Sequence, residues 1–291
     1  MNKKFKNNSE IGFTLIEMLG AVLIVVILSG VLIASNRGAV TQAVDTKVKA
    51  FATSIPITLS GSYIANWKLD QINYPTTNQT PDSWGANVGT LNGATLPVLQ
   101  TSGCVYNNCL NFSGDDYIDM GNPINFQIST GTAEAWIKTA NAGSSYRGIV
   151  VKPGAYGMFL KDNIFEIYDW TQGDLTTNIN LADNNWHHVL FIFNAGATNG
   201  TKLYIDSVLK LTTTMNINSQ SNILLLGSGS ISAQYFTGYI DDVRLYEDAL
   251  QIGQIQQNYL AGLKQLLASN QISEEDYASR LDALNQYIAQ N

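Results

Sequence analysis

The chain has 291 residues, which is enough for one large β-domain or for a domain with appendages. Charged residues make up 13% of it, well below the ~25% that is typical of soluble proteins. Asn, Thr, Ser and Gly replace them, a composition common on extracellular β-sandwich surfaces. The net charge of −7 and the lack of a basic stripe argue against nucleic-acid binding.

The N-terminus contains a segment long enough to span a membrane. Residues 13–34 carry Glu17 as their only charge and would form roughly 33 Å of helix. Lys3, Lys4 and Lys6 precede the segment, which orients the N-terminus towards the cytoplasm. A secretory signal peptide has a shorter apolar region, and a plain membrane anchor leaves Glu17 without a role.

The stretch "GFTLIEMLGAVLIVVIL" resembles the prepilin signature of type IV pilins and type II secretion pseudopilins. The resemblance implies that residues 1–12 are a leader, cleaved after Gly12 by a prepilin peptidase, and that a methyltransferase modifies the new N-terminus at Phe13. It also implies that Glu17 recognises the N-terminus of a neighbouring pilin subunit. Glu17 would lie ~6 Å along the helix from Phe13, near the cytoplasmic interface, where the cost of a carboxylate is reduced.

The helix is expected to continue to residue 57. An apolar stripe with helical spacing leads to Pro56, which ends the helix: Val40, Val44, Val48, Phe51 and Ile55.

From residue 60 to 248 the pattern indicates strands. Short segments rich in Val, Ile, Tyr, Phe and Trp alternate with Gly, Asn and Asp turns, which predicts a mainly β, antiparallel sandwich or jelly roll. Asp206 and Ser207 lie between two strand-like runs and predict a tight hairpin turn.

Several of these segments resemble, in order, the laminin-G-like, concanavalin A-like jelly roll. They are "NWKLDQ" (66–71), "DSWGANVGTLNGA" (82–94), "CLNFSGDDYIDMG" (109–121), "AEAWIK", "WHHVLFIFN", "KLYIDSVL" and "FTGYIDDVRLYEDAL" (236–250). Some jelly rolls of this kind hold a structural calcium ion. Mapped onto this chain, the resemblance implies Ca²⁺ ligands at Asp82, Asn87 and Asp241, since oxygen ligands suit this ion. The alternative is that Asp82 caps a turn and Asp241 is solvated.

Cys104 and Cys109 are the two cysteines of the chain. There is no CxxC motif and both histidines lie elsewhere in the sequence, which argues against a zinc site. In an exported protein the pair predicts a small-loop disulfide, and the alternative is two free thiols in a loop.

The sequence favours a protein that is not an enzyme. Some relatives of the fold are glycosidases, which need two carboxylates about 5–9.5 Å apart. Glu166 and Asp169 are the nearest candidates, but three residues apart on one strand they would point to opposite faces. His187 and His188 are adjacent in a strand and lack a nucleophile motif, so we expect them to be structural.

Aromatic residues in turn-like segments could form a binding face for a glycan or a protein. The candidates are Trp84, Tyr146 and Trp170, with Tyr156 and Tyr235 in similar positions. Trp67, Trp136 and Trp186 lie within strand motifs and are expected in the core.

Residues 249–291 predict a helical hairpin. A capping-box pattern at 248–251 starts the first helix, and Ser273 followed by Asp276 starts the second. The hairpin either folds back on the head or pairs with another chain.

Together these features predict a type IV pilin-like subunit that displays a binding or adhesion domain. It would cross the cytoplasmic membrane once and then move to a filament on the cell surface. The alternatives are a minor pseudopilin and a membrane-tethered carbohydrate-binding protein that does not polymerise.

Overall fold

A computed structural model describes residues 63–74, 76–140, 143 and 145–290. These residues belong to one compact unit, residues 56–291. The leader, the helix predicted at 13–57, and Gly12, Phe13 and Glu17 lie outside the described ranges. Within those ranges, no helix has both the length and the apolar character needed to cross a membrane.

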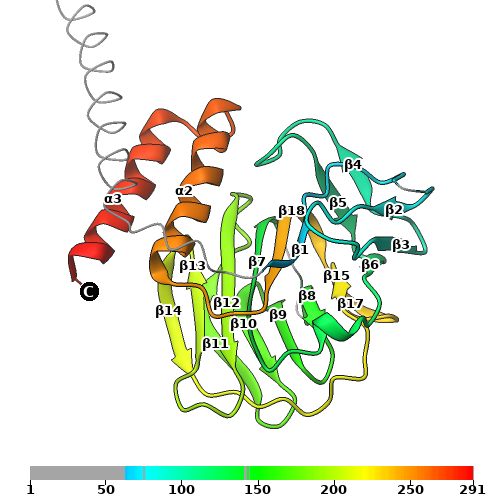
Figure 1. Ribbon diagram of the computed structural model, residues 1–291. Helices are drawn as coiled ribbons and strands as arrows, with labels where there is room; N and C mark the ends of the chain where they lie inside the picture. The colour runs from blue at the N-terminus through cyan, green and yellow to red at the C-terminus, as the bar shows by residue number, and fades with distance from the viewer. Residues whose placement is uncertain (1–62, 75, 141–142, 144, 291) are drawn as a thin grey trace, which may run out of the picture. The chain divides into compact units, whose positions relative to one another are not determined.

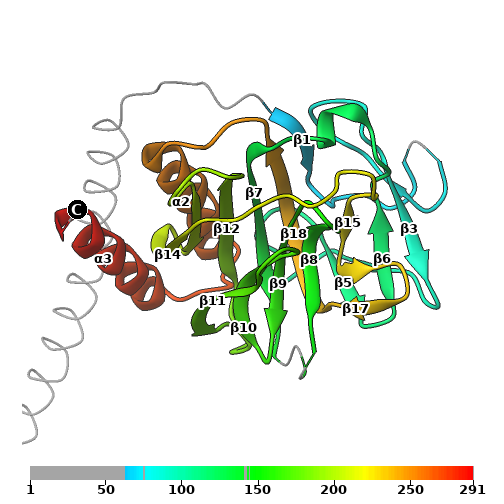
Figure 2. The same cartoon turned by 90° about the horizontal axis from the view of Figure 1, so that it is seen from below.

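The domain is a sandwich of two eight-stranded sheets, A and B, with antiparallel strand pairing (Figures 1 and 2). Sheet A has the order β14-β13-β12-β7-β18-β5-β4, and β1 pairs with β18. Its strands are β1 (Tyr63–Trp67), β4 (Val98–Gln100), β5 (Cys109–Ser113), β7 (Thr130–Lys138), β12 (His187–Asn194), β13 (Thr201–Ile205), β14 (Val208–Thr213) and β18 (Thr237–Tyr246).

Sheet B has the order β11-β10-β9-β8-β15-β6-β3-β2. Its strands are β2 (Gln79–Thr80), β3 (Gly89–Gly93), β6 (Asp116–Asp119), β8 (Arg147–Lys152), β9 (Tyr156–Lys161), β10 (Ile164–Asp169), β11 (Gly173–Asn180) and β15 (Leu225–Leu226). A short 3-10 helix, η1 (Ile124–Phe126), follows β6, and β16 (Ser228–Ser230) and β17 (Ala233–Tyr235) form a small hairpin.

The core lies between the two sheets, and strands such as β12 contribute alternate apolar residues to it. In β12, Val189, Phe191 and Phe193 belong to this core. The ring of Phe193 stacks on Tyr156 of β9, in the opposite sheet, with centroids 4.7 Å apart. Alternation along a strand sends neighbouring side chains to opposite faces, so a buried inner row defines which residues point outwards.

The hairpin predicted at Asp206 and Ser207 is confirmed. Both residues have positive φ, 50° and 66°, and they connect β13 directly to β14. Positive φ at both central positions is the geometry of the two-residue turn that matches strand twist.

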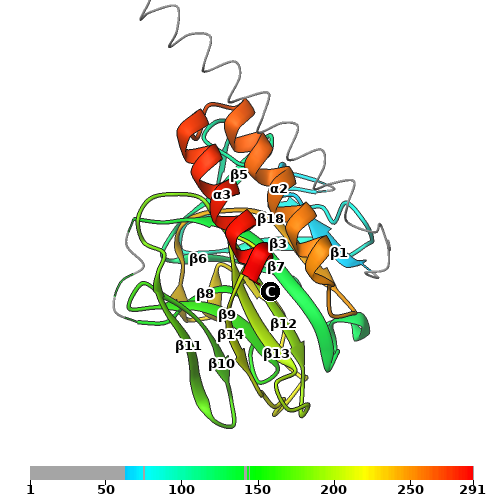
Figure 3. The same cartoon turned by 90° about the vertical axis from the view of Figure 1, so that its left-hand side faces the viewer.

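The C-terminal hairpin consists of α2 (Ile252–Ala268) and α3 (Glu274–Gln290), which lie together beside the sandwich (Figures 1 and 3). Of the two expected arrangements, the hairpin folds back on the head. Ser273 starts α3 as predicted, since Asp276 N donates to Ser273 Oγ over 3.0 Å.

The predicted start of α2 is wrong by a few residues. Gln251, and not Asp248, is the N-cap, and it forms a capping box with Gln254. Thr132 Oγ1 donates to Asp248 O and accepts from Leu250 N, at 2.8 and 3.0 Å. These two bonds hold residues 248–250 against sheet A, so the first helical turn begins after them, at Ile252.

Candidate binding surface

Aromatic and charged side chains gather on the outer side of sheet B. In β10, Phe165 and Ile167 belong to the core, so Glu166 and Tyr168 point outwards. We call a group of seven residues the outer patch: Tyr146, Lys161, Tyr168, Trp170 and Asp174, which are partly or fully exposed, and Phe159 and Glu166, which are buried beneath them.

The rings of the outer patch contact one another edge to face or at a tilt. Tyr168 lies between Tyr146 and Trp170, with ring centroids 5.6 and 5.4 Å away. Phe159 lies behind them, 5.8 Å from Tyr146 and 6.4 Å from Trp170, and it is buried. Tyr146, Tyr168 and Trp170 are only half-buried, so their remaining surface faces solvent.

Polar groups fix the edge of this patch. Tyr146 Oη donates to Asp174 Oδ1 over 2.5 Å and accepts from Lys161 Nζ over 3.0 Å. Lys161 also forms an ion pair with Asp174 and lies 4.6 Å from the centre of the Tyr146 ring. The Tyr146 ring is therefore held in one orientation before any ligand arrives.

Glu166 is an unusual carboxyl group in this patch. Burial raises its pKa to about 7, and the negative charge of Asp174 adds to the effect. Among the described residues, none donates a hydrogen bond to its buried Oε1 atom.

The structure brings together two of the three predicted ligand-binding aromatics. Tyr146 and Trp170 both lie in the outer patch. Trp84 lies elsewhere, 63% exposed, and its ring is 4.8 Å from Tyr63, which in turn contacts Tyr246. Sequence reasoning missed Tyr168, although Glu166 and Tyr168 of β10 and Trp170, which directly follows that strand, occur at every second position, and that period was the available signal.

The other aromatics divide between core and surface. Tyr156, considered a turn residue, is instead fully buried, and its hydroxyl donates to Phe126 O. Tyr235 is half-buried and stacks on Tyr117. Three tryptophans expected in the core are buried: Trp67, Trp136 and Trp186.

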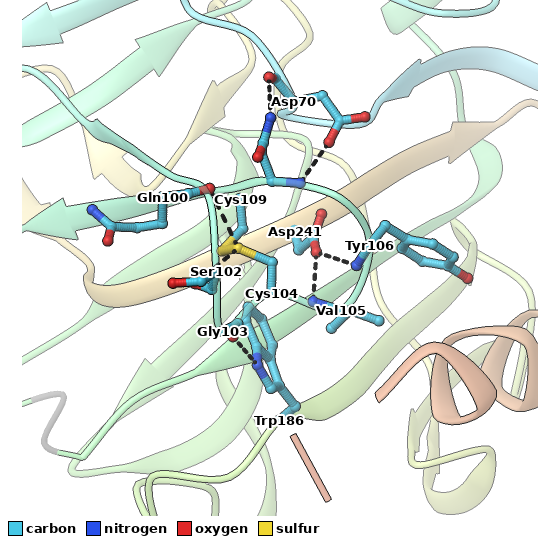
Figure 4. Close-up of a disulfide and its surroundings, with 11 residues drawn as sticks. Asp70, Gln100, Ser102, Gly103, Cys104, Val105, Tyr106, Cys109, Trp186 and Asp241 are labelled. Carbon is cyan, nitrogen blue, oxygen red and sulfur yellow. Dashed lines mark hydrogen bonds between the residues drawn. A yellow bond between two sulfur atoms is a disulfide. The ribbon is translucent and has the colours of Figure 1, made fainter. Parts of the chain in front are cut away.

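Cys104 and Cys109 form the predicted disulfide (Figure 4). The loop that it closes is held from two sides. Asp241 Oδ2 accepts hydrogen bonds from Val105 N and Tyr106 N, both 2.9 Å long. Asp70 Oδ1 accepts from Asn108 N over 2.9 Å on the other side of the loop.

Of the three residues predicted to bind calcium, Asp82 and Asn87 contact each other, and Asp241 bonds instead to the disulfide loop. The Asp82 carboxylate accepts hydrogen bonds from Trp84 N, Asn87 N and Asn87 Nδ2, which is the arrangement of a turn cap. Asp241 lies under the disulfide loop and is fully buried, so the alternative of a solvated Asp241 is wrong. The described residues hold no group of three or more His, Cys, Asp or Glu side chains that could bind a metal.

These hydrogen bonds leave Asp82 and Asn87 poorly suited to a metal ion, because N–H groups already occupy the carboxylate oxygens. Calcium binding through Asp82, Asn87 and Asp241 stays a prediction. A melting temperature that rises with Ca²⁺ in the parent chain, but not in Asp82→Asn, would support it.

The histidines lie on opposite sides of β12, as expected. His188 is buried under α2, with Nε2 3.2 Å from Glu134 Oε2. Glu134 also accepts from Arg244 Nη1, Tyr246 Oη and Asn258 Nδ2, at 3.2, 2.6 and 2.9 Å. Burial alone would raise the pKa of Glu134, but the His188 hydrogen bond and the Arg244 charge lower it to about 2.

Glu166 and Asp169 do not form a catalytic pair. Asp169 points towards the inner side of β10 and accepts hydrogen bonds from Thr171 N and Asn216 N, at 2.7 and 2.9 Å. The two carboxylates face opposite sides of the strand, as the sequence predicted, and cannot flank one glycosidic bond.

The fold defines a concanavalin A-like jelly roll. Residues 112–256 match a family profile described as the concanavalin A-like lectin/glucanases superfamily. The expected laminin-G-like, concanavalin A-like architecture is therefore confirmed for this domain. A comparison with curated protein sequences gave no match.

Solved structures of the same fold include domain 4 of AbnA, a GH43 extracellular arabinanase from Geobacillus stearothermophilus, in complex with arabinotriose. It is 18% identical, with a TM-score of 0.54, over 68% of this chain and 98% of that one. The receptor-binding domain of the botulinum neurotoxin C/D mosaic serotype has 15% identity and a TM-score of 0.53, over 69% and 52% of the two chains.

The binding domain of botulinum neurotoxin DC, in complex with rat synaptotagmin II, has 13% identity and a TM-score of 0.51, over 69% of this chain and 52% of that one. This chain thus spans about half the length of the neurotoxin chains. At these identities the similarity concerns the fold.

Proposed function

We propose that this chain is a pilin-like surface subunit whose jelly-roll domain binds a glycan through the outer patch. The observation that carries the binding proposal is the row Tyr146–Tyr168–Trp170, half-exposed and fixed by Lys161 and Asp174. Binding sites typically combine aromatic surface with a few well-placed polar groups, and this row has both. The domain would act by binding and would catalyse no reaction.

Two of the solved structures support a binding role by analogy. The arabinanase domain, matched over 98% of its length, is in complex with arabinotriose, and the neurotoxin binding domain, matched over 52% of its length, is in complex with synaptotagmin II. The outer patch favours the sugar, because flat rings fit the apolar faces of pyranose and furanose units, and the partly exposed Lys161 and Asp174 supply hydrogen-bonding groups at the rim.

A glycan array probed with the full chain tests this proposal. Trp170→Ala and Tyr168→Ala should each weaken binding by about tenfold, the effect of losing a central aromatic contact. Trp84→Ala removes an exposed tryptophan outside the patch and is the matched control. If Trp84→Ala abolished glycan binding while the patch variants bound normally, the assignment of the binding site to the outer patch would be wrong. If the chain bound a protein receptor and no glycan, the proposed ligand class would be wrong, and the ligand would be a protein.

The pilin-like part of the proposal rests on the prepilin signature at residues 11–28. Mass spectrometry of the mature protein should find Phe13 as a methylated N-terminus. Glu17→Lys should abolish incorporation into filaments while the cleavage after Gly12 continues. Normal filament incorporation of Glu17→Lys would contradict the assembly role.

The two alternatives, a minor pseudopilin and a membrane-tethered protein, predict different results for filament incorporation and for Glu17→Lys. A minor pseudopilin would be found at very few copies in a filament, and its loss would reduce the number of filaments. A membrane-tethered carbohydrate-binding protein would stay in the membrane fraction, and Glu17→Lys would leave its display unchanged.

A further inference from the structure

A cavity of about 280 Å³ lies between the edge of the sandwich and the C-terminal helices. Sheet A ends at β14 and sheet B ends at β11, and these two edge strands lie close to each other. The cavity is lined by Leu181, after β11, by Ile205 and Val208 of the β13–β14 hairpin, and by Tyr259 and Leu284 of the two helices.

Most of the cavity wall is apolar. Leu181, Ile205, Tyr259 and Leu284 are buried, so their side chains are fixed by packing on the side away from the cavity. An engineered apolar cavity of about 150 Å³ holds benzene, so a cavity of this size has room for roughly ten non-hydrogen atoms. Such a wall suits the body of a small organic molecule better than a sugar.

The polar part of the wall carries excess positive charge. Arg280 and Lys210 line the cavity, and so do His187 and Asp206. Asp206 is already satisfied, since His187 Nδ1 lies 2.8 Å from its Oδ2 and His188 N donates to its Oδ1 over 3.0 Å.

Arg280 is held in place by the protein. Its Nη1 atom donates to Trp186 O over 2.8 Å, which fixes the guanidinium group at the wall. A guanidinium group has five N–H donors in a planar fork and binds carboxylates strongly, because both partners are charged. Lys210 is exposed and lies at the same cavity, where it adds a second positive charge.

We propose that this cavity is a binding site for a small organic anion. The apolar part of the ligand would lie inside the cavity, and its carboxylate would bind the guanidinium group of Arg280. The site is distinct from the outer patch, which lies on the outer face of sheet B. It would give the helical hairpin a second role beside covering the sandwich.

Calorimetric titration of the full chain with phenylpropionate tests the proposal, with the neutral phenylpropionamide as the matched ligand. We expect the acid to bind more tightly than the amide. Arg280→Gln should weaken acid binding by about tenfold, the loss expected for a hydrogen bond to a charged group, and should leave amide binding nearly unchanged. Lys264→Gln removes an exposed positive charge on α2 away from the cavity and should bind both ligands like the parent chain.

Ala283→Trp tests the place of the site independently of charge. Ala283 lines the cavity from α3, and a large side chain there should exclude acid and amide alike. Thermal unfolding of each variant checks that the fold is kept. Equal affinity for acid and amide, unchanged acid binding in Arg280→Gln or in Ala283→Trp, or no binding at millimolar ligand would each overturn the proposal.

Discussion

Gly262 of α2 lies directly on the indole ring of Trp136 in β7. A Cβ atom built at Gly262 would fall 2.3 Å from Trp136 Cζ2, far inside contact distance. The same ring stacks on Tyr259 of α2 with centroids 5.8 Å apart, and it lies 5.1 Å from the ring of His188. The missing side chain therefore lets the helix approach sheet A closely enough for these contacts.

Gly262→Ala should destabilise the domain although alanine favours helices by about 1 kcal/mol over glycine. The added methyl group must displace Trp136 or lift α2, and such overpacking costs about 1–3 kcal/mol. Denaturant unfolding measures the net effect. Gly253→Ala, in the first turn of the same helix, is the control and should be neutral or stabilising. A Gly262→Ala chain more stable than its parent would contradict the close packing.

Glu134 should make the domain sensitive to acid. Its pKa is about 2 in the folded chain, against an ordinary value of 4.5. The ionised form is therefore favoured by folding, so this stability is present above pH 4.5 and is lost as the pH falls towards about 2.

Glu134→Gln should remove that part of the acid dependence and should cost about 1.5–3 kcal/mol at neutral pH, because Arg244 loses one charged hydrogen-bond partner but keeps its ion pair with Asp242. Unfolding curves between pH 2 and 7 measure both effects. The control is Glu275→Gln, exposed on α3. An acid profile of Glu134→Gln parallel to that of the parent would contradict the assignment.

Glu166 should give the folding stability a pH dependence opposite to that given by Glu134. Its pKa is raised from 4.5 to about 7, so folding favours the protonated form. The stability that this group contributes is full below pH 4.5 and is lost as the pH rises through about 7. Glu166→Gln should therefore gain stability relative to the parent as the pH rises, in melting temperatures measured from pH 4 to 8. Exposed Glu247→Gln should show no such divergence.

The disulfide loop should depend more on Asp241 than on its own covalent bond. Cys104 and Cys109 are five positions apart, so their disulfide closes a short loop. Replacing both residues should lower the free energy of unfolding by about 2 kcal/mol. Asp241→Ala leaves the buried Val105 N–H and the partly buried Tyr106 N–H without their acceptor, which costs about 1–3 kcal/mol for the buried group and less for the other.

We therefore expect Asp241→Ala to be less stable than the double Cys→Ala variant in denaturant unfolding. Asp241→Asn is the control, because it keeps an oxygen acceptor and resembles the protonated acid, which burial favours by raising the Asp241 pKa. A double cysteine variant that unfolds while Asp241→Ala stays folded would reverse this order.

Local patterns in the sequence were sufficient for much of the fold. Asp206 and Ser207 predicted their hairpin because a two-residue turn depends on adjacent residues. Cys104 and Cys109 predicted their disulfide because a pair so close in sequence needs little information about the fold. The jelly roll followed from motifs that occur in the order typical of that fold, whereas the pairing of the strands was not predicted.

The candidate site depended on contacts that local patterns do not contain. Tyr146 and Trp170 were identified singly, but Tyr146 comes next to Tyr168 because β10 pairs with β9 and β9 pairs with β8, which Tyr146 directly precedes. The burial of Asp241 also depends on long-range contacts, since the loop above it lies 135 residues away in sequence. The late start of α2 has the same origin, because Thr132 of a distant strand holds residues 248–250.

The helix that rests on Trp136 also leaves the proposed glycan contact with one place in the described domain. Because α2 lies against the outer side of sheet A, that contact lies on sheet B, and each described domain would offer one glycan contact. Single protein–sugar contacts of this size are weak, so firm attachment would require many copies on one surface. Linking weak sites in this way can raise the overall affinity by a factor on the order of 10²–10⁴. Adhesion would then be a property of the assembly and not of the individual domain.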